Sequence, residues 1–425
     1  MKILLLGSGG RENAFALKLS ESNRCKKLFI APGNAGTSAC GENINLSATD
    51  FAGIENFCVA NEIDMLVCGP EEPLVKGLHD YFLASEKVKH IPVIGPVATG
   101  AMLEGSKSYS KSFMLHYKIP TAAYDSFDVT RLEDGLNFIR MQKLPVVLKA
   151  DGLAAGKGVL ICDSHDEACH EFKEMLSGKF GGAGARVVVE EFLSGIEFSV
   201  FALCDGKNYV LLPEAKDYKR IGEGDTGLNT GGMGAISPVP FVDDALMKKV
   251  VNEIVEPTIA GLIADGISYK GFIYFGLIKT ADGVFVIEYN CRMGDPETEV
   301  VIPRLKTDLV DLFEAVGNGT LDKMNVEVTA DCAVTIVLAS GGYPGDFEKG
   351  KTITSTENIS DSLVFHAGTK TENGEVKTNG GRVMAITSFG KTLREALEKS
   401  NHNAAAIQFD GKYFRRDIGY EFLNQ

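Results

Sequence analysis

Short apolar runs alternate with helical patterns over the first hundred residues, and this alternation constrains the fold more than any other feature. The runs KILLLG, KLFIAPG, DMLVCGP and IPVIGP predict strands, and RENAFALKLSES and EEPLVKGLHDYFLAS predict helices between them. Strands that alternate with helices favour a parallel, doubly wound sheet. Ligands of such sheets bind beyond the carboxyl ends of the strands. The loops at 7–12, 31–37 and 69–73 are therefore candidate ligand-binding segments.

The rest of the chain mixes strands and helices. Residues 98–122 read as one helix that closes the first domain and enters the second. Between about 120 and 320, PVVLKA, RVVVEEF, FSVFALC, GFIYFGLI and VFVIEYN predict strands, and DALMKKVVNEIVEPTIAGLIADG predicts a helix. The last hundred residues hold two apolar strand patterns and the helical pattern TLREALEKSNHNAAAI. A chain of 425 residues suggests about three domains.

Acidic residues outnumber basic ones. The 57 Asp and Glu residues against 43 Lys and Arg give a formal net charge of −14. This balance argues against a nucleic acid or a membrane surface as the main partner. The first apolar run is too short for a secretion signal, and no segment approaches the length of a membrane span. We expect a cytoplasmic protein that acts on small molecules as a monomer.

The nine cysteines are scattered, and no C-x-x-C occurs. This distribution suits free thiols in a reducing compartment. Cys162, His165, Cys169 and His170 lie close together and could suggest a metal site. Their acidic, helical surroundings favour a solvated helix face instead.

The stretch VVLKADGLAAGKGVLI (146–161) predicts two strands joined by a loop of small residues between Lys149 and Lys157. Such a loop can lay backbone N–H groups and a lysine against a phosphate. It is not a P-loop, because it has one residue too few between its glycines and Gly158 stands where Ser or Thr should hold magnesium. The segment is a phosphate loop of another kind or only a hairpin.

The loop GSGGRE follows the first predicted strand. A dinucleotide fingerprint would need glycine where Glu12 stands, and no acidic residue ends the second strand, so an NAD(P) oxidoreductase is not supported. Arg11 and the amides of Gly9 and Gly10, at a predicted helix N-terminus, suit an anion such as a sugar phosphate. A tight turn without a ligand is an equal alternative.

Two acidic residues, Glu190 and Glu191, end the apolar strand VVVEEF. Backbone groups of residues 190–193 could pair with a purine edge, and Glu197 could accept hydrogen bonds from ribose hydroxyls. Taken alone, the segment is more typical of a solvated strand end.

The segment VFVIEYNCRMGDPETE (284–299) is the strongest candidate site. Residues two apart on a strand face the same side, so Glu288 and Asn290 project together. Both offer hard oxygen ligands that suit Mg²⁺ bridging nucleotide phosphates. Arg292 continues that face if the strand persists.

Asp217, Lys219 and Arg220 lie in the glycine-rich stretch KDYKRIGEGDTGLNTGGMGA (216–235). A solvated loop is the default interpretation of such a stretch. Beside a nucleotide and metal site, it would be a lid or a substrate clamp.

Across nearly its whole length the sequence resembles the phosphoribosylamine–glycine ligases, ATP-grasp enzymes of purine synthesis. The motifs that carry the resemblance are GSGGRE, PGNAGT, GPE, LEGSKSYSK, KADGLAAGKGV, EEFLSGIEFS, NTGGMGAISP, EYNCRMGDPETE, HAGT and GGRV. The resemblance implies a mixed α/β and α+β architecture. Its parts would be a doubly wound N-terminal domain (1–103), an ATP-grasp domain (104–325, with a flexible part at about 120–195) and a small β-rich C-terminal domain (326–425).

The resemblance also implies an activity. ATP would phosphorylate the carboxylate of glycine, and the amine of 5-phosphoribosylamine would attack the resulting glycyl phosphate, in the second step of IMP synthesis. ATP and Mg²⁺ or Mn²⁺ would be required. Two alternatives stay open, namely another ATP-grasp carboxylate–amine ligase or carboxylase component, and a nucleotide-binding regulator without catalysis.

The resemblance assigns residues to each ligand. The adenine and ribose contacts would be Glu190, Glu191, Phe192, Leu193 and Glu197. The phosphate contacts would be Lys107, Lys149, Gly156, Lys157, Gly158, Arg220 and Asn229, with the loop 152–158 as a lid on ATP. The metal ligands would be Glu288 and Asn290. The phosphoribosyl contacts would be Gly10, Arg11, Glu12, Asn34, Gly36, Thr37 and Glu71. The catalytic candidates would be Asp217, Lys219, Arg292 and Asp295, of which Asp217, Arg292 and Asp295 would contact glycine and the reacting amine.

The sequence departs from the family pattern at several of these motifs. The family usually has histidine where this chain has Asn13 and Tyr218, so no role for histidine carries over to these positions. Other departures are Lys216, Leu228, Met293 and Glu299. Asp217, Lys219 and Arg220 match the pattern, so the implied activity stands.

Overall fold

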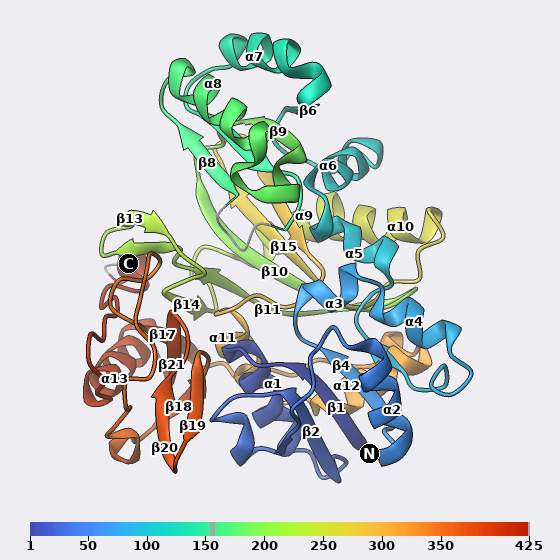
Figure 1. The fold of residues 1–425 in the computed structure, drawn as a ribbon, viewed down its shortest axis with the longest axis vertical. Helices are drawn as coiled ribbons and strands as arrows, with labels where there is room; N and C mark the ends of the chain where they lie inside the picture. Colours follow the sequence, from blue (N-terminus) through green and yellow to red (C-terminus); the bar gives the residue numbers. More distant parts are fainter. Residues whose placement is uncertain (154–157, 424–425) are drawn as a thin grey trace.

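The computed structural model describes residues 1–153 and 158–423. The N-terminal region is a five-stranded parallel sheet in the order β3-β2-β1-β4-β5 (Figure 1). This confirms the predicted doubly wound sheet. Helix α1 (Gly10–Ser20) starts directly after β1, so its N-terminus lies at the carboxyl end of the sheet, and α2 (Phe51–Asn61) precedes β4. The strands are β1 (Lys2–Gly7), β2 (Lys27–Pro32), β3 (Glu42–Asn43), β4 (Met65–Cys68) and β5 (Val93–Ile94).

Two of the predicted helices are each divided in two. The helix expected after β4 is α3 (Glu71–Val75) and α4 (Leu78–Ala84), separated at Gly77, whose φ of +86° favours glycine. The helix expected over 98–122 is α5 (Ala98–Gly105) and α6 (Lys107–His116). Ser106 between them is extended, and its hydroxyl accepts a hydrogen bond from the Tyr109 amide. This cap starts α6 at Lys107.

An eight-stranded sheet, antiparallel at every pairing, forms the centre of the molecule in the order β16-β15-β10-β11-β14-β17-β21-β18. The pairing of β14 with β17 joins the central region to the C-terminal strands, so one sheet spans both. The strands are β10 (Ile196–Asp205), β11 (Tyr209–Asp217), β14 (Gly234–Ser237), β15 (Lys270–Lys279), β16 (Val284–Asn290), β17 (Cys332–Ala339), β18 (Ser362–His366) and β21 (Arg382–Gly390).

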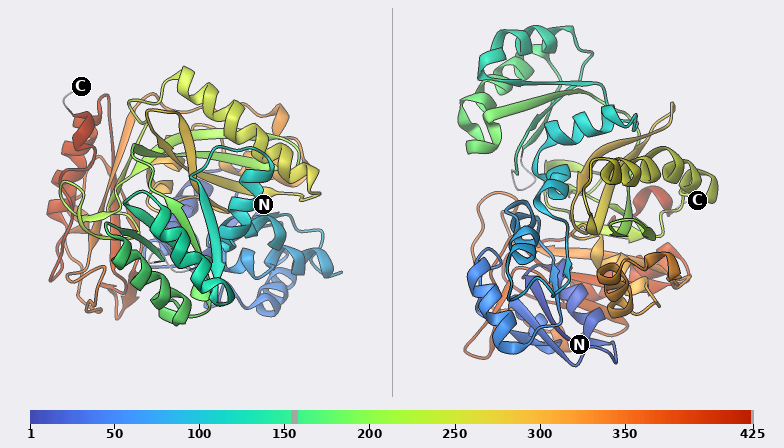
Figure 2. Two further views of the ribbon diagram at one scale, coloured as in Figure 1. Left: turned by 90° about the horizontal axis from the view of Figure 1, so that it is seen from above. Right: turned by 90° about the vertical axis from the view of Figure 1, so that its right-hand side faces the viewer.

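A four-stranded antiparallel sheet, β6-β9-β7-β8, forms a separate small body with helices α7 (Leu132–Met141) and α8 (His165–Glu174). It has its own core, which includes Phe127, Leu148 and Phe172. Figures 1 and 2 show this body standing apart from the N-terminal sheet. Its strands are β6 (Tyr124–Asp128), β7 (Val146–Ala150), β8 (Val159–Cys162) and β9 (Arg186–Glu191).

The remaining elements cover the sheets or connect them. The helices are α9 (Asp244–Val250), α10 (Glu256–Ala264), α11 (Thr298–Val301), α12 (Leu309–Asn318) and α13 (Leu393–Ala406). Two hairpins are formed by β12 (Arg220–Gly222) with β13 (Thr226–Asn229) and by β19 (Thr369–Glu372) with β20 (Glu375–Thr378). All nine cysteines are free, as expected. Among the described residues, no helix has the length and apolar character needed to cross a bilayer.

Candidate nucleotide and substrate site

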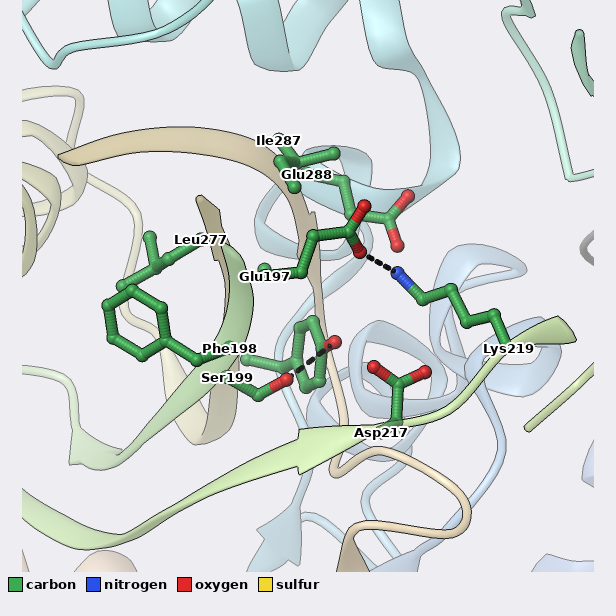
Figure 3. Close-up of a pocket in the computed structure, with 10 residues that line it drawn as sticks. Glu197, Phe198, Ser199, Asp217, Lys219, Leu277, Ile287 and Glu288 are labelled. Carbon is green, nitrogen blue, oxygen red and sulfur yellow. Dashed lines mark hydrogen bonds and ion pairs between the residues drawn. The ribbon is translucent and has the colours of Figure 1, made fainter. Parts of the chain in front are cut away.

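Charged side chains from β10, β11 and β16 face one pocket of the central sheet (Figure 3). Glu197 and Ser199 come from β10, Asp217 ends β11, and Glu288 comes from β16. Lys219 follows β11 and points between the carboxylates of Glu197, Asp217 and Glu288. The other lining residues are Phe198, Tyr274, Gly276, Leu277 and Ile287. The structure thus brings together several candidates that lie far apart in the sequence.

Lys219 balances the carboxylates of this pocket. Its Nζ lies 2.7 Å from Oε2 of Glu197, and both side chains keep contact with solvent. Burial alone would lower the pKa of Lys219, but Asp217 and Glu197 raise it well above its ordinary value. Lys219 in turn lowers the pKa of Glu197. Burial raises the pKa of Asp217, and Lys219 only partly opposes that shift. Lys219 therefore stays charged and available to an anionic ligand.

Lys149 belongs to a buried cluster that the sequence did not predict. Its Nζ lies 2.9 Å from Oε2 of Glu190, and Nζ of Lys111 lies 3.2 Å from the same oxygen. Lys149 also donates to the carbonyl of Ile287, which lines the pocket (3.1 Å). Oε2 of Glu190 is thus used to hold two lysines, whereas its Oε1 is buried without a hydrogen-bond partner among the described residues. Lys111 was missed because a lysine in a polar helix is usually solvated.

Lys107, the first residue of α6, donates to the carbonyl of Gly152 at 3.3 Å. Burial lowers its pKa, and the charge of Glu288 partly opposes that effect. Asp151 fixes this corner, because its carboxylate accepts hydrogen bonds from the hydroxyls of Ser106 and Ser108. Lys107 and the start of the predicted phosphate loop therefore lie side by side. Gly156 and Lys157 lie outside the described residues, and Gly158 precedes β8.

The predicted purine segment lies where β9 ends. Glu190 and Glu191 close the strand, and Phe192 and Leu193 follow it. The Glu191 carboxylate accepts a hydrogen bond from the Ala123 amide at 2.8 Å, while Phe192 is exposed. The segment connects β9 to β10, and so joins the small body to the central sheet.

Glu288 and Asn290 lie two residues apart on β16, as predicted. The Glu288 carboxylate lines the pocket and makes no hydrogen bond or ion pair within the described part of the chain. A carboxylate and an amide offer the hard oxygen donors that Mg²⁺ prefers, so this pair fits a metal shared with phosphates. No group of three or more His, Cys, Asp or Glu residues suited to a metal occurs in residues 1–153 and 158–423.

Arg292 lies beyond the end of β16, so the argument from strand alternation does not extend to it. Its guanidinium pairs with Glu71 at 3.4 Å and with the buried Glu104 at 2.8 Å. Glu104 also accepts a hydrogen bond from the Cys291 amide. Arg292 therefore ties the segment after β16 to α3 and α5 of the N-terminal region. Glu104 was not predicted as a site residue.

Arg11 and Glu12 fill the space at the start of α1. Nε of Arg11 lies 2.6 Å from Oε1 of Glu12, and both side chains are buried. Arg11 also donates to the carbonyl of Met293, and its own amide donates to Oδ2 of Asp295. The first turn of α1 is thus connected to the GDPET motif across 284 residues of sequence.

The loop after β2 is held by its own side chains. The Asn34 Oδ1 atom accepts from the amides of Gly36 and Thr37, and its Nδ2 donates to the carbonyl of His366. Thr37 is fully buried. Asn13, where the family usually has histidine, accepts a hydrogen bond from the His366 amide at 2.7 Å. The side chains of Asn34 and Thr37 therefore shape the loop.

Asp295 is paired by a residue of the C-terminal region. Oδ1 of Asp295 lies 2.9 Å from NH1 of Arg382, which lies on β21 and also donates to the carbonyl of Gly231. Glu299 lies beside them, buried, and burial raises its pKa well above the ordinary value. The Oε2 atom of Glu299 has no hydrogen-bond partner among the described residues. Arg382 and His366 lie in the GGRV and HAGT motifs, which no ligand assignment had used.

Arg220 and Asn229 are paired across the β12–β13 hairpin. Arg220 donates to the carbonyl of Gly227 at 2.8 Å, and the neighbouring Leu228 is 66% exposed. Because Lys219 directly precedes β12, the hairpin begins at the edge of the pocket.

The four-stranded sheet, which carries Lys149 and Glu190, and the central sheet, which carries Glu197, Asp217 and Glu288, together define an enzyme of the ATP-grasp class. Three models of the phosphoribosylglycinamide synthetase family match the chain: the N domain over residues 1–104, the ATP-grasp (A) domain over 105–298 and the C domain over 333–421. The chain therefore belongs to the phosphoribosylamine–glycine ligase family, whose members form a C–N bond.

Individual relatives agree with this assignment. A phosphoribosylamine–glycine ligase of Vibrio cholerae is 44% identical over 429 residues, which is 100% of this chain and 99% of the relative. The crystal structure of the Thermotoga maritima phosphoribosylamine–glycine ligase matches with a TM-score of 0.86 and 38% identity, over 98% of this chain and 100% of that chain. A biotin carboxylase of Campylobacter jejuni matches with a TM-score of 0.71 at 14% identity, over 100% and 95% of the two chains, which shows a shared fold alone.

Proposed function

We propose that this chain joins glycine to 5-phosphoribosylamine in the second step of purine biosynthesis. ATP phosphorylates the glycine carboxylate, the amine attacks the acyl carbon, and phosphate leaves as the amide forms. Membership of the ligase family supports this reaction. The observation that carries it is the pocket of Glu197, Asp217, Lys219 and Glu288, because a nucleotide, a metal and a carboxylate substrate need such opposed charges in one place.

The nucleotide is held between the two antiparallel sheets. Lys107 and Lys149 neutralise its phosphates, since both lysines lie at the start of the phosphate loop that runs from 152 to 158. Backbone groups of residues 190–193 contact the adenine. Glu197 accepts from the ribose, and Lys219 exchanges its partner Glu197 for the ligand. Arg220 and Asn229 contact the phosphates from the β12–β13 hairpin.

A divalent metal, Mg²⁺ or Mn²⁺, would be held by Glu288 and Asn290. When bound, it would offset the negative charge that develops during phosphoryl transfer. Support for this assignment comes from the two oxygen donors on one face of β16 and from the Glu288 carboxylate, which forms no ion pair with any described residue.

The substrates bind between the N-terminal sheet and the GDPET motif. The phosphoribosyl group contacts the first turn of α1 at Gly10 and Arg11, Glu12 and the loop with Asn34, Gly36 and Thr37, with Glu71 nearby. Arg292 binds the glycine carboxylate. A guanidinium has five N–H groups, and three of those of Arg292 have partners in the structure. Asp217 and Asp295 orient the attacking amine.

ADP release is the direct test. Purified protein is mixed with ATP, Mg²⁺ and glycine, with and without freshly made 5-phosphoribosylamine. We expect ADP only when both substrates are present, matched by glycinamide ribonucleotide. ADP formed with a different carboxylate or amine would support another ATP-grasp ligase. Nucleotide binding without ADP under any combination would support a regulator.

Glu288→Ala tests the metal assignment. This variant should lose metal-dependent turnover by at least about 10³-fold while its unfolding curve stays the same, because a metal ligand supplies several kcal/mol in the transition state. The matched control is Glu253→Ala, a change on a helix of the same region. An active, metal-dependent Glu288→Ala enzyme would contradict the assignment.

We also propose that the protein is a cytoplasmic monomer. Light scattering on the purified protein would test the oligomeric state.

A further inference from the structure

The β12–β13 hairpin has little to stabilise it from within. All four residues of β13 are exposed, including Leu228. Its turn contains Gly224 and Asp225, with φ values of +65° and +54°. A two-stranded hairpin is marginally stable in water on its own, and a left-handed aspartate adds to the cost. Contacts from elsewhere in the chain must therefore hold Arg220 in place.

The guanidinium of Arg415 supplies those contacts. Arg415 is fully buried, and its NH1 donates to Oδ1 of Asp225 at 2.6 Å and to the carbonyl of Arg220 at 3.1 Å. Its Nε and NH2 each lie 2.9 Å from an oxygen of Asp417, a bidentate pair. One planar group therefore bonds both the first residue of β12 and the turn of the hairpin.

Neighbouring residues of the same segment extend this network. Oδ2 of Asp417 accepts from the Gly224 amide at 2.7 Å, and the Tyr413 hydroxyl donates to the carbonyl of Ile221 at 2.8 Å. The ring of Tyr218, just before Lys219, lies 5.5 Å from the Arg415 guanidinium. The C-terminal segment thus contacts the hairpin on its turn, on β12 and at the residue that leads into it.

We propose that Arg415 and Asp417 are positioning residues for nucleotide binding. They hold the β12–β13 hairpin at the pocket edge, so that Arg220 and Lys219 meet the phosphates without first being ordered by the ligand. A loop ordered in advance does not cost affinity on binding. The inference rests on the proposed function for the role of Arg220, but the network itself consists of contacts within the free protein.

Arg415→Lys is the sharpest variant, since lysine keeps the charge but cannot make the bidentate and bridging bonds. We expect the Kd for a non-hydrolysable ATP analogue with Mg²⁺, and the KM for ATP, to rise about tenfold. The KM for glycine should stay within about twofold, because Arg292, the proposed contact of the glycine carboxylate, bonds to Glu71 and Glu104 and not to the hairpin. The control is Arg416→Ala, which removes an exposed neighbouring arginine, and we expect its Kd and KM values to match the wild type.

Tyr413→Phe keeps the test informative if Arg415→Lys does not fold. It removes one partly exposed hydroxyl and its bond to Ile221, so a rise of about twofold in the nucleotide Kd is expected with no change in the unfolding curve. The proposal would be overturned if folded Arg415→Lys bound the nucleotide with the wild-type Kd. It would also be overturned if Arg416→Ala raised the nucleotide Kd as much as Arg415→Lys. Calorimetry measures the Kd without turnover. If the wild type binds nucleotide but forms no ADP, the proposed reaction is refuted, and the Kd comparison between the variants can still be made.

Discussion

Glu190 and Glu197 are both paired with lysines at the proposed nucleotide site, yet the Glu190 cluster is buried and the Glu197 pair is open to solvent. The side chains of Glu190 and Lys149 are 4% and 6% exposed, whereas those of Glu197 and Lys219 are 45% and 37% exposed. Removing a charge from water is expensive, so the buried cluster depends on every partner. An open pair costs little to separate, and its members can turn to a ligand. The buried Glu190 cluster therefore acts as a fixed support, whereas Glu197 and Lys219 can separate from each other and contact a ligand.

Glu190→Gln should produce the largest effect on stability. It would leave Lys111 and Lys149 buried with no anionic partner at their centre, so we expect the free energy of unfolding to fall by about 3–5 kcal/mol. Urea unfolding monitored by far-UV circular dichroism would measure the change. The matched control is Glu191→Gln, whose side chain is exposed and bonds one amide. Equal stability of the Glu190→Gln variant and the wild type would show that the lysines do not need this carboxylate.

Glu297→Gln extends the comparison to a third carboxyl group, which is buried beside Asp217. Burial, together with the charge of Asp217, raises the pKa of Glu297 to about 7. In the folded state the group then keeps its proton up to about pH 7, whereas in the unfolded chain it loses it near pH 4.5. Its contribution to stability is therefore complete below about pH 4.5 and is lost as the pH rises to about 7.

As the pH rises from 5 to 7, the wild type should lose stability relative to Glu297→Gln by about 1.4 kcal/mol per pH unit. Urea unfolding of both proteins at pH 5, 6, 7 and 8 would measure it. A constant difference across that range would mean that Glu297 titrates as an ordinary glutamate.

Glu197→Gln should change stability least, by under about 1 kcal/mol, because its pair is open to solvent. We expect the KM for ATP to rise about tenfold, since a carboxylate is a stronger acceptor for ribose hydroxyls than an amide. Steady-state ADP release at varied ATP would test this. A variant that loses several kcal/mol of stability with unchanged KM would reverse the roles assigned to the two clusters.

Local patterns were sufficient for most of the fold. The alternation of the first hundred residues predicted the parallel sheet, and RVVVEEF and VFVIEYN predicted β9 and β16. The pattern failed over 98–122, where apolar spacing continues through Ser106 although the chain turns. Gly105 and Ser106 are helix-ending and helix-capping residues, so this break had a signal that periodicity alone overlooked.

The site was predictable only in part, for a physical reason. Asp217, Lys219 and Glu288 lie at strand ends or on strands, where sequence motifs place them, and they do face one pocket. Lys111 lies on a polar helix and Glu104 near the end of a short helix, and nothing local distinguishes either from a solvated side chain. Their burial results from tertiary packing, as does the approach of Arg415 to the hairpin 190 residues earlier.

The hydrogen-bonded pairing of β14 with β17 has a consequence for how the chain can be divided. Ile236 and Val334 are partners in one continuous sheet, although the C-terminal strands look like a separate unit in the sequence. Cutting the chain near residue 325 would uncover a row of backbone donors and acceptors on each fragment. Such exposed strand edges pair with strands of other chains. Each fragment should therefore aggregate when expressed alone, and both should be soluble when they are expressed together.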